Sequence, residues 1–120
     1  TWVAKCKNEL INNYKKCFFV EKNKKIIGSI IFQPHKKEKN ILEIKNFRVS
    51  LEHRKEGIGS RLYKETERYA REKGFKIIQI DTHENNEELI KFLTKKYFKV
   101  IEKKPLYEKT QMEIILQKEL

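Results

Sequence analysis

A short loop with two glycines, Arg54-Lys55-Glu56-Gly57-Ile58-Gly59, constrains the fold most, because it joins a strand pattern directly to a helix pattern. Upstream, residues Ile41 to Val49 have the apolar and β-branched content of a strand. Downstream, apolar residues recur at helical spacing until Gly74, which is placed to end the helix after Lys73. The first N–H groups of such a helix lack intrahelical partners and lie at the positive end of its dipole, so the turn suits a phosphate.

The two glycines of this loop have two interpretations. Gly57 and Gly59 can let the backbone come close to an anion, where a side chain would stand in the way. Alternatively, a tight strand-to-helix turn needs glycine for its dihedral angles alone, since short glycine patterns recur by chance. The spacing differs from the three-glycine dinucleotide fingerprint and from a P-loop, which ends in Gly-Lys-Ser/Thr.

The remaining segments predict an α+β domain with a mixed, mostly antiparallel sheet of about six strands. Residues Trp2 to Asn13 have a weak helical pattern, and we expect a helix there. The strand of residues 75–81 should be central and parallel to the strand before the glycine loop. The expected elements after Trp2–Asn13 are strands at 17–20, 25–32 and 41–49, a helix at 58–73, a strand at 75–81, a helix at 86–96, and strands at 98–101 and 112–116.

Length and composition indicate a single domain over residues 1–120, with 38% hydrophobic residues. We expect no membrane association, because no apolar run approaches the length of a membrane span. Cys6 and Cys17 have no metal-like or redox-like spacing, and as two lone thiols they favour a reducing, cytoplasmic setting. The three histidines, His35, His53 and His83, have no ligand spacing, so we expect no metal.

The formal net charge is +11 and the pI about 9.6, which raises the question of an acidic partner. The lysines are spread through every segment, and no nucleic-acid-binding signature accompanies them. We therefore expect no specific nucleic-acid partner. A general positive field would still attract a coenzyme that carries several phosphates.

The string from Val49 to Leu62, Val-x-x-x-x-Arg-x-x-Gly-Ile-Gly-x-x-Leu, resembles motif A of the GCN5-related N-acetyltransferase (GNAT) superfamily. Leu51 stands where members often have proline. The resemblance covers about residues 15–116 and implies a GNAT fold with helices on both faces of the sheet. The first strand and helix of that fold are not recognisable, so we expect either a minimal member or an N-terminally truncated one.

The resemblance implies acetyl-coenzyme A (acetyl-CoA) as cosubstrate, with its pyrophosphate held by the glycine loop. A second segment, Asn86 to Phe98, is similar to the family signature Asn-x-x-Ala-x-x-Phe-Tyr-x-Lys-x-Gly-Phe, in which the asparagine contacts the coenzyme. The coenzyme contacts that the two motifs imply are Phe47, Val49, Arg54, Lys55, Glu56, Gly57, Ile58, Gly59, Ser60 and Asn86.

This second segment departs from the family signature at three positions. Leu89 replaces a small residue, Leu93 replaces the tyrosine that serves as general acid, and Tyr97 replaces a glycine at the helix end. We expect the turn at Tyr97 to be made differently. A residue four positions on shares a helix face, so Tyr97 can supply the missing hydroxyl. Alternatively, Tyr97 packs in the core and the thiolate leaves without an acid.

The family mechanism is direct attack of an amine on the acetyl thioester within a ternary complex. It requires a base, and Glu43 stands eleven residues before Arg54, the offset of the glutamate base in the histone-acetyltransferase branch. The oxyanion would be stabilised by backbone N–H groups near Phe47 to Val49. Glu43 can equally be a solvated strand residue, and Asp81-Thr82-His83-Glu84 is a second candidate for the base.

These observations favour an N-acetyltransferase that acts on a primary amine of a small molecule or peptide, an acceptor that the sequence does not identify. The alternative is a catalytically weak GNAT-like module that binds acyl-CoA and acts as a sensor, which the replacement by Leu93 supports. A third hypothesis is a basic nucleic-acid-binding domain with an incidental glycine turn. Related folds often dimerise through a sheet edge, so a homodimer is compatible with the resemblance.

Overall fold

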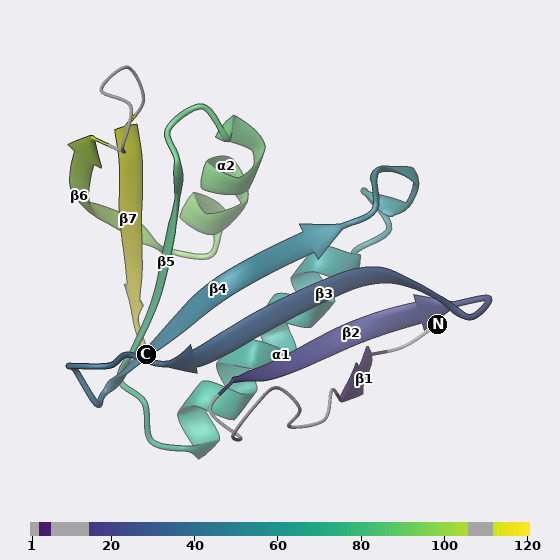
Figure 1. Cartoon of the computed structure of the whole chain (residues 1–120), viewed down its shortest axis with the longest axis horizontal. Coiled ribbons are helices and arrows are strands. Elements are labelled where there is room, and N and C mark those ends of the chain that lie inside the picture. The colour runs from purple at the N-terminus through teal and green to yellow at the C-terminus, as the bar shows by residue number, and fades with distance from the viewer. Residues whose placement is uncertain (1–2, 6–14, 106–111) are drawn as a thin grey trace.

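The computed structural model describes residues 3–5, 15–105 and 112–120, which form one mixed sheet and two α-helices (Figure 1). The strand order in the sheet is β1-β2-β3-β4-β5-β7-β6. This arrangement confirms the predicted α+β fold class. The elements are β1 (Val3–Lys5), β2 (Lys16–Lys22), β3 (Lys25–Pro34), β4 (Ile41–Val49), a 3-10 turn η1 (Leu51–His53), α1 (Ile58–Glu72), β5 (Ile77–His83), α2 (Glu87–Lys95), β6 (Lys99–Pro105) and β7 (Met112–Glu119).

The sheet is antiparallel except where β4 and β5 lie side by side. β1 to β4 are antiparallel neighbours, and β7 inserts antiparallel between β5 and β6. β4 and β5 pair in parallel, as predicted, because α1 carries the chain back between them. Asn23 and Lys24 turn the β2–β3 hairpin with positive φ angles of 52° and 66°, a conformation that suits the twist of a tight hairpin.

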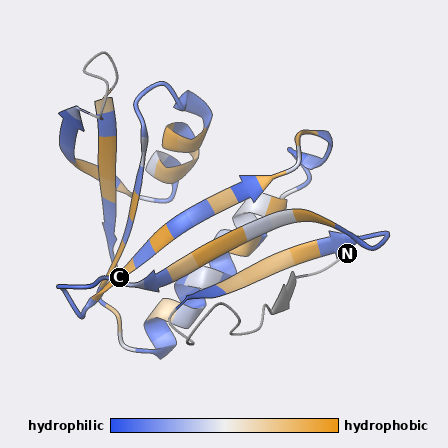
Figure 2. Ribbon diagram, in the orientation of Figure 1, coloured by the Kyte–Doolittle hydropathy of each residue, from blue (hydrophilic) through white to orange (hydrophobic). Residues whose placement is uncertain are grey.

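Helix α1 packs its apolar stripe against β2, β3 and β4. The helix buries five residues at helical spacing, and hydrophobic and hydrophilic residues alternate along β4, one of the strands that it contacts (Figure 2). Gly74 follows the helix with φ +85°, so the predicted helix end is confirmed. The buried residues of α1 are Ile58, Leu62, Tyr63, Thr66 and Ala70.

Helix α2 lies beside α1. Phe92 of α2 contacts Phe47 of β4 at a ring-centroid distance of 5.7 Å and Tyr63 of α1 at 6.4 Å. Asn86 is the N-cap, as predicted, and its side chain accepts a hydrogen bond from the Leu89 N–H. The Phe92 ring therefore joins α2 to both α1 and β4.

The N-terminal prediction is partly wrong. Val3–Lys5 form a strand that pairs with β2, where we expected a helix. The rest of the expected helix lies outside the described residues. Cys17, on β2, is disulfide-bonded, so the expectation of two lone thiols is wrong. The cysteines therefore give no support for a reducing compartment.

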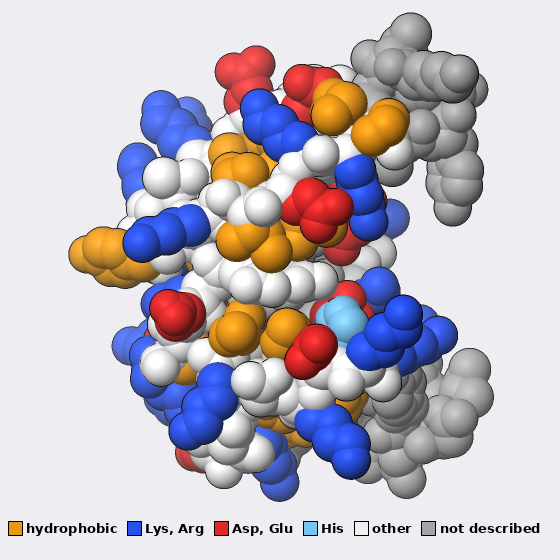
Figure 3. Space-filling model, turned by 90° about the vertical axis from the view of Figure 1, so that its left-hand side faces the viewer, with side chains coloured by type: hydrophobic (Ala, Val, Ile, Leu, Met, Phe, Trp, Pro, Cys, Tyr) orange, Lys and Arg blue, Asp and Glu red, His pale blue; other side chains and the backbone are white. Residues whose placement is uncertain are grey.

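Within the described ranges, no helix has the length and apolar character needed to cross a membrane. Lys and Arg side chains are spread over the side of the molecule seen in Figure 3, with acidic and apolar side chains between them. The positive charge on this side therefore does not gather into one basic surface.

Candidate functional site

The two parallel strands separate halfway along their length. Residues Ile41 to Ile44 of β4 pair with Ile77 to Ile80 of β5. Beyond this point, among the described strands, β4 pairs only with β3 and β5 only with β7. The strands therefore diverge in a V toward their carboxyl ends, which is visible in Figure 1. Ligands of open sheets bind outside the carboxyl ends of parallel strands, so the V is the first candidate site.

A β-bulge in β4 lies where the V begins. Ile44 is the register partner of Phe32 and Asn46 that of Ile31, which leaves Lys45 as the extra residue. A bulge shifts the alternation of side chains by one residue. As a result Ile44 before the bulge and Phe47 after it both belong to the apolar core side, and the β4 backbone turns away from β5.

The start of α1 lies at the open end of the V, directly after the loop that follows β4. Gly57 is its N-cap, provides no side-chain cap and has φ +81°. The Arg61 N–H donates to the Gly57 carbonyl, and the three preceding N–H groups, of Ile58, Gly59 and Ser60, have no partner among the described residues. No acidic residue occupies the first turn. These donors and the helix dipole make the N-terminus of α1 suited to bind an anion.

The structure separates the roles of the two loop glycines. A Cβ on Gly57 would meet nothing within 4 Å, so this glycine is needed for its left-handed dihedral angles, which is the alternative interpretation of the loop. A Cβ on Gly59 would contact Val49 Cγ2 at 3.6 Å and Phe47 Cζ at 3.8 Å. Gly59 therefore lies in the close contact between the helix start and β4.

A third glycine, Gly28 of β3, also positions this helix and was not predicted from the sequence. A Cβ there would lie 2.8 Å from Ile58 Cγ2 and 3.2 Å from Leu62 Cδ1. Gly28 thus lets α1 approach the sheet closely. Its isolated place within a strand pattern was the available signal, since such glycines often mark a close approach.

Arg54 and Asn86 lie on the two sides of the V. Arg54 Nε donates to the Val49 carbonyl over 3.2 Å, and its Nη1 donates to Glu88 Oε1 of α2 over 2.8 Å. Asn86 Nδ2 donates to Thr82 Oγ1 at the end of β5 over 3.2 Å. The loop residue and the helix cap are therefore each linked to the carboxyl end of one diverging strand.

Glu43 lies at the base of the V, on the sheet side opposite its buried neighbours Leu42 and Ile44. Gln79 Nε2 donates to Glu43 Oε2 over 3.5 Å, and Gln117 Nε2 donates to Gln79 Oε1 over 2.6 Å. Three polar side chains on three adjacent strands thus form a row. Glu43 was predicted as a candidate from the sequence, whereas its partners Gln79 and Gln117 were not, because they come from distant segments.

The second candidate for the base, Asp81 to Glu84, is divided among other contacts. Glu84 Oε2 accepts a hydrogen bond from the Met112 N–H over 3.1 Å, which ties it to β7. A hydrogen bond with Asp81 raises the pKa of the Glu113 carboxyl, and its partial burial acts in the same direction. Asp81 of β5 and Glu113 of β7 therefore form a pair of carboxyl groups on the β5 side of the V.

Both expected positions of Tyr97 are wrong. Leu93 is fully buried, whereas Tyr97 is 79% exposed, so the two residues do not share a face and Tyr97 does not pack in the core. The helix ends before it, and the Phe98 N–H donates to the Leu93 carbonyl over 3.0 Å. Tyr97 takes φ +75°, so the turn is made with the left-handed conformation that glycine usually supplies.

A sequence profile of the acetyltransferase (GNAT) family matches residues 2–98 of the chain. The chain belongs to the GNAT acetyltransferase family. Its fold is similar to that of an IAA acetyltransferase from Bacillus cereus, with a TM-score of 0.84, 15% identity and coverage of 98% of both chains. A search of functionally characterised proteins found no match.

Two further structures resemble this GNAT chain and hold the coenzyme. One is named as a streptothricin acetyltransferase from Bacillus anthracis in complex with acetyl coenzyme A, with a TM-score of 0.80, 23% identity and coverage of 93% of this chain and 69% of that one. The other is a GNAT family acetyltransferase from Elizabethkingia anophelis with acetyl-CoA bound, with a TM-score of 0.73, 26% identity and coverage of 89% and 77%.

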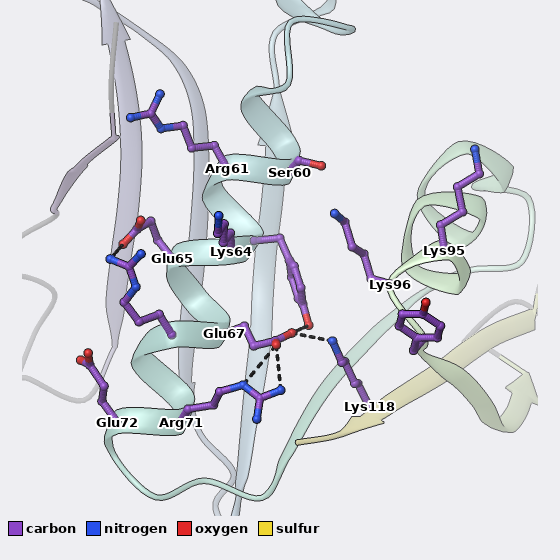
Figure 4. Close-up of a pocket in the computed structure, with 13 residues that line it drawn as sticks. Ser60, Arg61, Lys64, Glu65, Glu67, Arg71, Glu72, Lys95, Lys96 and Lys118 are labelled. Carbon is purple, nitrogen blue, oxygen red and sulfur yellow. Dashed lines mark hydrogen bonds and ion pairs between the residues drawn. The ribbon is translucent and has the colours of Figure 1, made fainter.

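A groove of about 900 Å³ follows the outer side of α1 in this GNAT chain, between α1, the end of α2 and Lys118 of β7 (Figure 4). Glu67 is at its centre and accepts hydrogen bonds from the Tyr63 hydroxyl over 2.6 Å, Lys118 Nζ over 2.7 Å and Arg71 Nη2 over 3.0 Å. Burial alone would raise the pKa of Glu67, but these donors lower it to about 2. Burial raises the pKa of Tyr63.

This cluster around Glu67 was not predicted from the sequence, because only part of it is local. Tyr63, Glu67 and Arg71 follow each other at the four-residue spacing that brings side chains together on a helix, which was an available signal. Lys118 comes from a strand 51 residues away. Within the described part of the chain, no group of three or more His, Cys, Asp and Glu side chains has the arrangement of a metal site.

Proposed function

We propose that this GNAT chain is an acetyl-CoA-dependent N-acetyltransferase that acetylates a primary amine of a small molecule or peptide. The observation that carries the proposal is the uncapped start of α1 at the open end of the V, within a chain that belongs to this family. The coenzyme bound in the Elizabethkingia structure, at 26% identity, supports acetyl-CoA as the cosubstrate.

The coenzyme site of this proposal runs from the glycine loop into the V. The backbone of Lys55 to Ser60 would bind the pyrophosphate, with the N–H groups of Ile58, Gly59 and Ser60 as the unpaired donors. The remainder of the coenzyme would contact Phe47 and Val49 on the β4 side of the V and Asn86, the N-cap of α2, on the β5 side. Arg54 and Glu56 belong to the same loop, and Arg54 can turn from Glu88 toward the phosphates.

In the proposed reaction the acceptor amine attacks the thioester carbonyl carbon in the ternary complex. A C–N bond forms, and the oxyanion is stabilised by backbone N–H groups of β4 beyond Ile44, where β4 has no strand partner on the β5 side among the described residues. The C–S bond then breaks and the coenzyme leaves as thiolate. Glu43, at the base of the V, takes the ammonium proton. Tyr97 is not needed as an acid, since a thiol is acidic enough to leave as thiolate.

The experiment that tests the coenzyme site is calorimetric titration with acetyl-CoA, comparing the unaltered protein with Ser60→Glu. A carboxylate in the first turn of α1 is favoured by the helix dipole, so the variant should fold. It would oppose the pyrophosphate directly, and we expect Kd to rise at least about tenfold.

The matched control is Lys103→Gln on β6, which lowers the net charge by the same one unit at an exposed position. Its Kd should stay within about twofold of the unaltered protein, because distant exposed charges are screened. Equal weakening by both variants would show that only the overall field attracts the coenzyme. Failure of the unaltered protein to bind acetyl-CoA would overturn the proposal.

One observation favours the alternative, a GNAT module that binds acyl-CoA without efficient turnover. Leu93 occupies the position of the family's general acid and is buried, and Tyr97 is turned outward to Lys118, 5.9 Å from its ring. Acetyl-CoA binding combined with no thiol release over a broad amine panel would favour this alternative. Turnover that falls strongly in Glu43→Gln would favour the enzyme.

A further inference from the structure

A second hollow, of about 670 Å³, lies on the sheet face that carries Glu43. Glu43 of β4 and Gln33 of β3 are register partners, so their side chains project from the same face into this hollow. Glu43 immediately precedes Ile44, the last β4 residue that pairs with β5. The hollow therefore meets the base of the V, where the proposed reaction would take place.

Gln33 is an unpartnered polar group at the floor of the hollow. Its side chain is 5% exposed, and its Oε1 has no hydrogen-bond partner among the described residues. A buried carbonyl without a donor is unfavourable, and rotation of the amide can turn this oxygen toward a ligand. With the Glu43 carboxylate beside it, the floor offers hydrogen-bond acceptors, which suit an ammonium group or an amine N–H.

The rim of the same hollow carries hydrogen-bond donors and positive charges instead of acceptors. His35 Nδ1 accepts hydrogen bonds from the Lys37 and Glu38 N–H groups, both over 3.0 Å, so the neutral ring carries its proton on Nε2 as a donor. Four lysines line the rim against the single carboxylate, and none of them forms an ion pair within residues 15–105 and 112–120. These lysines are Lys15, Lys36, Lys37 and Lys45.

We propose that this hollow is the acceptor site, and that the acceptor is a small amine that also carries a carboxylate or a phosphate. The amine would bind Gln33 and Glu43, and the anionic group would bind the lysines and His35 Nε2. The volume is that of a small-molecule pocket. This inference rests on the proposed function, because it names the substrate class of the same reaction.

The test compares amines that differ only in the anionic group: O-phosphoethanolamine with ethanolamine, and β-alanine and L-phenylalanine with their amides. Thiol release from acetyl-CoA gives kcat/KM for each compound. We expect the anionic member to be favoured at least tenfold in one or more pairs. The phosphate and carboxylate pairs identify which anion the rim accepts.

The double variant Lys36→Ala/Lys37→Ala should reduce this preference to near unity by raising KM. The control Lys99→Ala/Lys103→Ala removes the same charge from exposed positions of β6 and should keep the preference. Equal use of charged and uncharged amines by the unaltered protein would overturn the inference and leave the N-acetyltransferase function standing. A clear preference for acidic peptides over every small amine would also overturn it.

If no amine is acetylated, the proposed function fails, and the site is tested by binding alone. Titration with O-phosphoethanolamine or β-alanine, followed by NMR at the Gln33 side-chain amide and the His35 ring, should give saturable shifts. Ethanolamine should not give them. Equal shifts with ethanolamine, or none with the anionic amines, would overturn the site.

Discussion

Arg54 and Glu88 form an ion pair across the open end of the V, with Nη1 and Oε1 2.8 Å apart. Arg54 also donates to the Val49 carbonyl, so its side chain links the end of β4 with the first turn of α2. Both side chains are well exposed, and such pairs contribute less than about 1 kcal/mol to stability. A pair this weak can open when an anion at the α1 start competes for the guanidinium.

The variant Glu88→Gln should therefore bind acetyl-CoA more tightly, with Kd lowered about threefold, because Arg54 is released and one opposing charge is removed. Calorimetry measures the affinity. The control Glu87→Gln removes a charge from the same turn, so the difference between the two variants isolates the ion pair. Equal affinity of both variants would argue against a role of Arg54 in binding.

The variant Gly28→Ala should lower the free energy of unfolding by about 1–3 kcal/mol, because the added methyl group would lie 2.8 Å from Ile58 Cγ2 and displace the start of α1. Acetyl-CoA affinity should fall with it. Urea denaturation measures the stability. Gly59→Ala is the control: its methyl group meets ordinary contacts of 3.6 Å or more within a helix, so stability should be unchanged or higher. Similar losses in both variants would contradict this account of α1 packing.

Local patterns in the sequence were sufficient to predict most elements. The helix from Ile58 to Lys73, its end at Gly74 and the N-cap Asn86 follow from apolar spacing and cap chemistry, which depend on neighbouring residues. The parallel pairing of β4 and β5 follows from the helix between them. Local patterns failed at Val3–Lys5, where pairing with β2 outweighs a weak helical spacing.

The features that shape the site depend on residues far apart in sequence. The bulge at Lys45 is defined only by the partner strand β3, and the separation of β4 from β5 only by their common register. The hollow that contains Gln33 likewise combines residues of distant segments, and so does the hydrogen bond from Lys118 to Glu67. Tyr97 was misplaced for a related reason, since burial of Leu93 and Phe98 fixes the turn that directs Tyr97 outward.

The variant Tyr97→Gly should raise the free energy of unfolding by about 1 kcal/mol, because a residue with a Cβ is strained at φ +75° and glycine is not. Thermal unfolding measures this gain. Tyr97→Phe keeps the strain and removes only the hydroxyl, so it should change neither stability nor kcat by a measurable amount. A large fall of kcat in Tyr97→Phe would restore the hydroxyl as the general acid.

Acid should destabilise the protein through Glu67, whose pKa of about 2 in the folded chain lies below its ordinary value of 4.5. As the pH falls, the unfolded chain therefore binds a proton at Glu67 before the folded chain does. The carboxylate's contribution to the free energy of unfolding is complete above about pH 5 and is lost progressively toward pH 2. Urea unfolding at several pH values should show the advantage of the unaltered protein over Glu67→Gln shrinking across this window. Tyr63→Phe keeps the carboxylate with Lys118 and Arg71, so it should retain most of the pH dependence. An advantage over Glu67→Gln that does not change between pH 5 and pH 2 would show that the donors around Glu67 do not hold its charge.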